Sequence, residues 1–188
     1  MCRYLVSRIL RNASIVCSEM KIVITGFMGS GKTRVAGALA QRLDLEIVDL
    51  DDMVTAKEGR TPAQLIVDEG EETFRSIESA ALHELLQTDN AHVIALGGGA
   101  WIEKTNRDLI KEYGYVSVWL DAPFDICWTR IDASTEDRPL GRTKEQAQRL
   151  YDRRRPIYQL ADVRIPIGNE DFDDLISRIE RVLAADLR

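Results

Sequence analysis

A glycine-rich run near the N-terminus contains the residue types that hold a phosphate group. It consists of Gly26-Phe27-Met28-Gly29-Ser30-Gly31-Lys32-Thr33, two spaced glycines followed by Lys and Thr. Glycines let the backbone turn with positive φ, so successive N–H groups can surround the inner phosphates of a nucleotide. Lys32 adds a positive charge, and the hydroxyl of Thr33 suits Mg²⁺ at the start of the following helix. The run predicts a nucleotide site; a plain flexible turn is the competing interpretation.

An acidic cluster follows the second predicted strand. The segment 45–50 has the apolar character of this strand, and Asp49, Asp51 and Asp52 stand at its carboxyl end. Residues two apart in an extended chain face the same way, so Asp49 and Asp51 can point together. Open α/β sheets bind their ligands at this edge. The alternative is that Asp51 or Asp52 caps a helix.

Arginines and glycines farther along the chain are candidates for the rest of the site. On a predicted helix, Arg75 would ordinarily be a solvated charge or the partner of Glu71 one turn away. Gly97–Gly99 end a predicted strand, which favours close approach of a ligand to the backbone, although a flexible turn fits equally. Residues 132–142 are polar, lack apolar periodicity and include Arg138. In a phosphate-handling protein such a loop is the expected lid.

Buried strands alternate with amphipathic helices along the chain. The predicted strands are 21–25, 45–50, 92–96, 115–120 and 163–167. The main predicted helices are 34–43, 71–86, 123–131, 143–156 and 171–187. This alternation predicts a three-layer α/β/α fold with a five-stranded parallel sheet and right-handed connections. Pro166 places the last strand near an edge of that sheet.

Length, charge and cysteine content limit the class of protein. The chain has 188 residues and a net charge of -6, which favours one domain and argues against general affinity for nucleic acid or an anionic membrane. No apolar run is long enough to cross a bilayer. Cys2, Cys17 and Cys127 form no even disulfide set, which favours the cytoplasm. We expect residues 1–19 to be a dispensable extension and residues 20–188 to form the single functional domain.

Further motifs follow the phosphate run in a definite order. They are Asp49-Leu50-Asp51, Phe74-Arg75-Ser76-Ile77-Glu78, Gly97-Gly98-Gly99-Ala100, Arg138-Pro139-Leu140 and Arg154-Arg155-Pro156-Ile157-Tyr158. With these motifs the chain, from Lys21 onward, resembles the shikimate kinases, which are P-loop NTPases of the nucleoside-monophosphate-kinase type. The resemblance implies ATP-dependent phosphorylation of the 3-hydroxyl of shikimate, in the chorismate pathway to the aromatic amino acids.

The resemblance also implies a role for each candidate residue. The ATP-binding residues would be Gly29, Ser30, Gly31, Lys32, Thr33, Arg34 and Arg138. The shikimate-binding residues would be Asp51, Arg75, Gly98 and Arg154. Mg²⁺ would be held by Thr33 with help from Asp49. The chemistry agrees, because a carboxylate suits guanidinium forks and ring hydroxyls suit a carboxylate and backbone amides.

The implied reaction is an in-line phosphate transfer. Asp51 would orient the acceptor hydroxyl and take its proton, while Lys32 and Arg138, together with Mg²⁺, would stabilise charge on the transferring group. Closure of the lid at 132–142 would exclude water. We expect Arg130, just before the lid, to lie near the adenine, and the enzyme to work as a monomer.

Two positions depart from the family pattern. Ile66 stands where a phenylalanine often lines the substrate pocket, and Trp101 stands where a smaller residue is usual. Within the arginine run 153–155, Arg154 is chosen by its distance from Pro156.

Other classes of protein fit the sequence less well. A gluconate kinase would share the phosphate site and also accept a carboxylated substrate, but the order of the motifs favours shikimate. A GTP-dependent switch protein would need NKxD and DxxG, and the sequence has neither where they are required. His83-Glu84 begins like a zinc-binding HExxH, but Gln87 takes the place of the second histidine.

Overall fold

The protein is built on one parallel sheet of five strands, seen in a computed structural model that describes residues 20–88, 91–135 and 137–186. The strands are β1 (Ile22–Thr25), β2 (Ile47–Asp49), β3 (Val93–Ala95), β4 (Val116–Asp121) and β5 (Val163–Pro166). Their order across the sheet is β2-β3-β1-β4-β5, and every pair is parallel. The predicted fold class is confirmed, and β5 lies at an edge as its proline predicted. The extension 1–19 lies outside the described residues.

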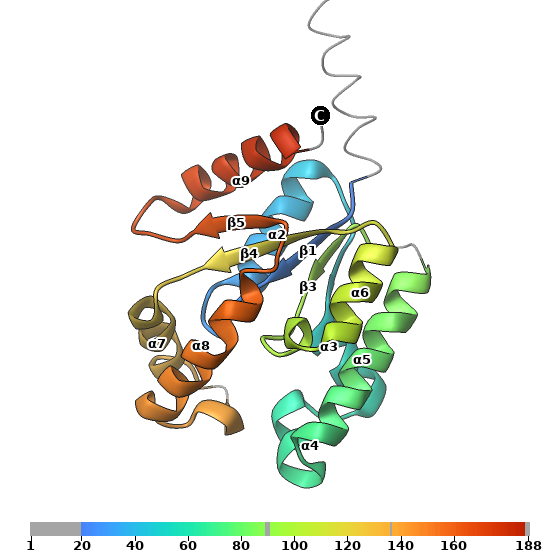
Figure 1. Ribbon diagram of the computed structural model, residues 1–188, viewed down its shortest axis with the longest axis vertical. Helices are drawn as coiled ribbons and strands as arrows, with labels where there is room; N and C mark the ends of the chain where they lie inside the picture. The colour runs from blue at the N-terminus through green and yellow to red at the C-terminus, as the bar shows by residue number, and fades with distance from the viewer. Residues whose placement is uncertain (1–19, 89–90, 136, 187–188) are drawn as a thin grey trace, which may run out of the picture.

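Helices cover both faces of the sheet. They are α2 (Lys32–Leu43), α3 (Leu50–Glu58), α4 (Pro62–Glu69), α5 (Glu71–Thr88), α6 (Lys104–Glu112), α7 (Phe124–Asp132), α8 (Lys144–Tyr158) and α9 (Phe172–Asp186), with short 3₁₀ turns η1 (Ala100–Ile102) and η2 (Pro139–Gly141). α2 packs against α9 on one face, and α5 packs against α6 on the other (Figure 1). α8 continues through Pro156 to Tyr158, two residues past its predicted end.

Local sequence signals explain where the helices around the site begin. Thr61 and Gln64 form a reciprocal capping box at the start of α4. The side chain of Thr143 accepts a hydrogen bond from the backbone N–H of Gln146 and so caps α8. Gly59 ends α3 in the left-handed conformation, with φ of 66°. These caps fix the ends of three helices that carry or border the functional residues.

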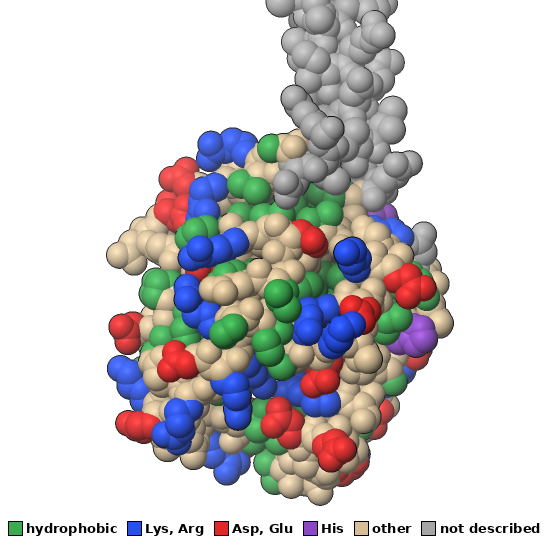
Figure 2. All heavy atoms as spheres, in the orientation of Figure 1, with side chains coloured by type: hydrophobic (Ala, Val, Ile, Leu, Met, Phe, Trp, Pro, Cys, Tyr) green, Lys and Arg blue, Asp and Glu red, His purple; other side chains and the backbone are tan. Residues whose placement is uncertain are grey.

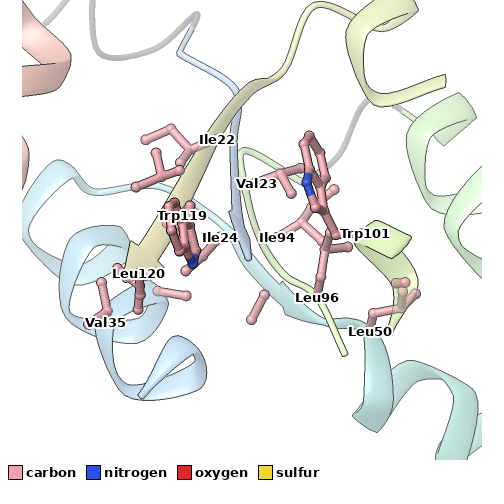
Figure 3. Close-up of a cluster of buried hydrophobic side chains, with 14 of the residues drawn as sticks. Ile22, Val23, Ile24, Val35, Leu50, Ile94, Leu96, Trp101, Trp119 and Leu120 are labelled. Atoms are coloured by element: carbon pink, nitrogen blue, oxygen red, sulfur yellow. The ribbon is translucent and has the colours of Figure 1, made fainter. Parts of the chain in front are cut away.

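The core lies on both sides of β1, whose residues are fully buried. Ile22 and Ile24 point to the side of Trp119, while Val23 points to the side of Trp101 (Figure 3). Successive side chains of a strand point to opposite faces of the sheet. Because helices cover both faces of this sheet, the side chains on both faces of β1 must be apolar. The central strand that leads into the phosphate run is therefore held from both sides.

The surface carries charges of both signs. Basic and acidic side chains are interspersed over the face in Figure 2. Among the helices of the described segments, none combines the length and apolar character that a membrane span requires.

Candidate active site

The phosphate run forms a tight loop between β1 and α2. Gly29 and Gly31 have φ of 76° and 96°, the left-handed region that glycine adopts without strain. A Cβ on Gly29 would come within 2.6 Å of the carbonyl oxygen of Cys127, so the loop also requires glycine there for space. The loop closes on itself, since Ser30 N–H and Lys32 Nζ both donate to the carbonyl of Phe27, each at 3.1 Å.

The N-terminus of α2 is open to an anion. Gly31 is its N-cap and provides no side-chain hydrogen bond to the first turn. Backbone N–H groups at such a helix start, together with the positive end of the helix dipole, favour a phosphate. The geometry therefore matches the phosphate cradle that the sequence predicted.

The acidic cluster is arranged differently from the prediction made from the sequence. β2 ends at Asp49 and α3 begins at Leu50, so Asp51 lies in the first helical turn and the extended-chain argument for a shared direction was wrong. The helix cap is Asp49, not Asp51 or Asp52, because Asp49 Oδ1 accepts from the N–H of Asp51 at 3.0 Å. The other oxygen, Oδ2, accepts from Thr33 Oγ1 at 2.7 Å. A hydroxyl and a carboxylate thus meet beside the phosphate loop, a donor pair that suits a hard cation such as Mg²⁺.

Asp51 and Lys32 act on each other across the site. Burial raises the pKa of Asp51 above its ordinary value, and the Asp49 carboxylate raises it further. Burial lowers the pKa of Lys32, while the charge of Asp51 acts to raise it and that of Arg138 to lower it. Asp51 and Arg138 therefore lie near enough to Lys32 to influence its titration. An aspartate with a raised pKa is suited to accept a proton.

The predicted substrate residues meet in one cavity of about 600 Å³. Asp51, Arg75, Gly98, Arg138 and Arg154 all line it. They come from α3, α5, the loop after β3, the segment before η2, and α8. Segments far apart in the sequence are thus brought to the same edge of the sheet, as the carboxyl ends of parallel strands require.

Two of the three arginines that line the cavity, Arg75 and Arg154, pair with acidic side chains on α5. Arg75 Nη1 donates to Glu78 Oε2 at 2.6 Å, and Arg75 Nη2 pairs with Glu71 Oε1 at 3.2 Å. The same oxygen of Glu71 lies 3.6 Å from Arg154 Nη2. The interpretation of Arg75 as a helical partner of Glu71 is therefore correct, and so is its place in the cavity. One carboxylate bridges both guanidinium groups.

Glu78 is a buried residue of the cavity lining to which the sequence analysis gave no role. Its side chain is fully buried, and its Oε1 has no hydrogen-bond partner within the described part of the chain. Burial raises the pKa of Glu78 to about 7, although the neighbouring Arg75 acts to lower it. The signal was present in the sequence, since Glu78 follows Arg75 by three residues, the spacing of neighbours on one helical face.

The glycine run is needed for close packing of these charged groups. A Cβ on Gly97 would lie 2.5 Å from Asp51 Oδ1, and a Cβ on Gly99 would lie 2.2 Å from Arg75 Cζ. Gly98 is different, because its Cβ would meet nothing closer than 3.5 Å. The outer glycines therefore make room for side chains of the site, and the approach of a ligand to this backbone stays a prediction.

The fold also decides which arginine of the run 153–155 faces the cavity. Arg154 is buried and lines the cavity, as predicted, whereas Arg153 is exposed. Arg155 points the other way and pairs with Asp121 at 3.4 Å. Successive residues of a helix point about 100° apart, so only one of three can face the cavity directly.

The remaining predicted residues lie around the phosphate loop. Arg130 Nη1 donates to the carbonyls of Gly29 and Ser30, at 3.0 and 3.2 Å, so it borders the loop itself. Arg34 is exposed, and its guanidinium lies 3.8 Å from the ring centre of Phe172. Their contacts with ATP stay predictions.

The two departures from the family pattern have clear places in the structure. Ile66 is half-buried and lines the cavity from α4. Trp101 is buried in η1, and its indole Nε1 donates to the carbonyl of Ile157 on α8 at 3.1 Å. Trp101 therefore joins the segment after the glycine run to α8.

Known proteins match the chain over most of its length. The model of the family described as shikimate kinase matches residues 28–184. A shikimate kinase of Rhodopirellula baltica is 37% identical over 165 residues, covering 84% of this chain and 87% of that protein. One from Symbiobacterium thermophilum is 39% identical over 169 residues, covering 85% and 94%.

Solved structures agree with this relationship. A shikimate kinase from Acinetobacter baumannii in complex with shikimate has a TM-score of 0.84 at 30% identity, covering 92% of this chain and 98% of that one. A deoxyadenosine kinase from M. mycoides, at 18% identity and a TM-score of 0.63, shares only the fold. Matches of this extent and identity show that the chain belongs to the shikimate kinase family and is a kinase that transfers phosphate to shikimate.

Proposed function

We propose that shikimate binds in the 600 Å³ cavity with its carboxylate toward Arg75 and Arg154 and its 3-hydroxyl beside Asp51. The observation that carries this placement is the convergence of Arg75, Arg154 and Asp51, from three different helices, on the same cavity. Guanidinium forks recognise a carboxylate through charge-assisted hydrogen bonds. A carboxylate whose pKa is raised by burial is matched to an alcohol that must lose its proton.

ATP would place its phosphates in the loop between β1 and α2. Lys32 and the first amides of α2 would hold the inner phosphates, and Arg138 would face the transferring group from the lid side of the cavity. Asp51 would orient the 3-hydroxyl for in-line attack and accept its proton. Preorganised positive groups of this kind stabilise the charge that develops on the transferring phosphate.

Mg²⁺ is the expected cofactor, and the oxygen donors present fit it. Thr33 Oγ1 and Asp49 Oδ2 lie 2.7 Å apart beside the loop, so the hydroxyl would ligate the ion and the carboxylate would assist from the second coordination shell. When bound, the ion neutralises charge on the ATP phosphates. Thr33 and Asp49 orient each other for this role through their hydrogen bond.

The segment 132–142, in which residue 136 lies outside the described residues, is proposed to act as a lid. Arg138, Pro139 and Leu140 line the cavity together with Ile66 and Val67 of α4, and η2 contacts α4. Closure of this segment over the bound substrates would exclude water, which would suppress hydrolysis of ATP. We also propose that residues 20–188 form one catalytic domain that works as a monomer in the cytoplasm.

An acceptor screen tests the function. ADP release is measured with ATP and Mg²⁺ in the presence of shikimate, gluconate or a nucleoside monophosphate. We expect turnover with shikimate and phosphate on its 3-hydroxyl, which NMR of the product identifies. Faster turnover with gluconate, or phosphate at another hydroxyl, would overturn the proposed placement.

A further inference from the structure

A buried tyrosine at the end of α8 contacts both the cavity arginine and the glycine run. The hydroxyl of Tyr158 donates to the carbonyl oxygen of Gly98. Arg154 Nη1, one helical turn earlier, donates to the same oxygen at 3.3 Å. Arg154 and Tyr158 also lie near enough to each other to influence each other's pKa. The guanidinium, the phenol and one backbone carbonyl therefore form a triangle in which the carbonyl accepts from both side chains.

The position of the Tyr158 hydroxyl is fixed from several sides. Tyr158 is only 1% exposed, and its ring stacks on Trp119 with 6.3 Å between ring centres and 22° between planes. Trp101 donates to the carbonyl of Ile157, the residue just before Tyr158. Burial raises the pKa of Tyr158 to about 12, so the phenol keeps its proton and acts as a donor at neutral pH. A buried, stacked and protonated phenol is a rigid anchor.

The triangle also orients the backbone of the glycine run. In a trans peptide, the carbonyl and the following N–H point in opposite directions. Because the Gly98 carbonyl points to α8, the N–H of Gly99 faces away from α8. Gly99 itself lines the cavity. Within the described part of the chain, this N–H donates to no backbone carbonyl.

Tyr158 lies outside the lining of the cavity. Arg154 lines the cavity and Tyr158 does not, so the phenol acts from behind the arginine. Glu71 and the Gly98 carbonyl already restrict Arg154, and Tyr158 adds a third restraint through the shared carbonyl. Holding a long side chain in one rotamer costs conformational entropy when the substrate binds. A fixed partner removes part of that cost before binding.

We propose that Tyr158 is a positioning residue that holds Arg154 and the Gly98–Gly99 peptide in the geometry that receives the carboxylate end of shikimate. This inference rests on the proposed placement of that carboxylate. Tyr158 itself touches neither substrate nor nucleotide. Its loss affects shikimate binding and leaves the nucleotide site, which belongs to the loop between β1 and α2, unchanged.

The test compares two tyrosine-to-phenylalanine variants on the same helix. Tyr158→Phe removes the hydroxyl and keeps the ring volume. Tyr151→Phe is the matched control, because Tyr151 also donates to a backbone carbonyl, that of Ala122 at 3.0 Å, but does not line the cavity. We expect Tyr158→Phe to raise the KM and the calorimetric Kd for shikimate about 3- to 15-fold, the range for one lost hydrogen bond. The KM for ATP stays unchanged, and Tyr151→Phe leaves both KM values unchanged.

A double-mutant comparison asks whether Tyr158 acts through Arg154. In an Arg154→Gln background, Tyr158→Phe should change shikimate affinity less than it does in the natural chain, because its target has been removed. Equal effects in both backgrounds, or an unchanged shikimate Kd for Tyr158→Phe, would overturn the inference. The wild-type enzyme is assayed in parallel. Failure of the wild type to phosphorylate shikimate would instead refute the proposed function.

Discussion

Thr33 Oγ1 donates a 2.7 Å hydrogen bond to Asp49 Oδ2, which links the first turn of α2 to the end of β2. Asp49 is at the same time the N-cap of α3, so its carboxylate has one oxygen for the helix and one for the threonine. The link places a hydroxyl beside the phosphate loop with its orientation already set. This arrangement supports the proposal that a residue of the phosphate run and a residue of the acidic cluster serve one cation.

Removal of the Thr33 hydroxyl should weaken the use of Mg²⁺. We expect Thr33→Val to raise the Mg²⁺ concentration for half-maximal activity by roughly 10- to 100-fold, a range seen when metal ligands or their partners are lost. Thr33→Ser keeps a hydroxyl and should stay close to the natural enzyme. The measurement is initial rate against free Mg²⁺ at saturating ATP and shikimate. Equal Mg²⁺ dependence of the two variants would contradict the assignment.

Neutralising Asp51 should slow the chemical step. Asp51→Asn cannot accept the proton of the acceptor hydroxyl, so kcat should fall by roughly 10²- to 10⁴-fold. ATP should still bind, as measured by calorimetry, because Lys32 and the phosphate loop are unchanged. Asp152→Asn, on the exposed side of α8, is the control. Unchanged turnover of Asp51→Asn would remove Asp51 as the base.

Shortening the cavity arginine on α5 should weaken shikimate binding. Arg75→Lys keeps the positive charge but loses the guanidinium fork, which can pair with Glu78 and the substrate at the same time. The free energy of shikimate binding should therefore weaken by about 1.5 to 3 kcal/mol. The shikimate KM reports this loss, and the ATP KM should not move. Arg153→Lys, which changes an exposed arginine of α8, provides the comparison. An unaltered shikimate KM would return Arg75 to a purely structural role.

Glu78 should make the stability of the substrate-free protein depend on pH. Its pKa is raised from the ordinary 4.5 to about 7, so between these pH values the folded protein binds more protons than the unfolded chain. The free energy of unfolding should therefore fall as pH rises from about 4.5 to about 7, by an amount on the order of 3 kcal/mol. Glu78→Gln has no proton to lose and should show a flatter profile of melting temperature against pH.

The neighbouring Glu72 provides the control for this effect. Glu72 is exposed on the same helix, so Glu72→Gln makes the same change of charge without burial. Its melting temperature should follow the natural pH profile. If Glu78→Gln and Glu72→Gln give parallel profiles across this range, the buried carboxyl of Glu78 is not the source of the slope.

Deletion of the first nineteen residues should leave catalysis intact. Every residue assigned to ATP, shikimate or Mg²⁺ lies between Gly29 and Arg154, and the buried core includes Met20. We expect a chain that begins at Met20 to keep its kcat and both KM values. A large fall in kcat or a large rise in either KM would show that the extension belongs to the enzyme.

Features set by neighbours in sequence could be predicted without the structure. The phosphate loop depends on glycines and a helix start within eight residues, and the five strands show as apolar runs of strand length. The cap of α4 by Thr61 and the ion pair of Arg75 with Glu71 likewise join residues three or four apart. Such contacts follow from helix geometry alone.

Contacts between distant segments needed the tertiary structure. The sequence could not show that Asp49 caps α3, because the boundary between strand and helix depends on packing of the whole sheet edge. Nor could the sequence show that Glu71 on α5 reaches Arg154 on α8. It also could not show that Arg154 and Tyr158 of α8 share the Gly98 carbonyl in the loop after β3. These contacts join segments that are far apart in the sequence. The order of the strands brings those segments to one edge, and that order is decided by burial of the whole core rather than by any local pattern.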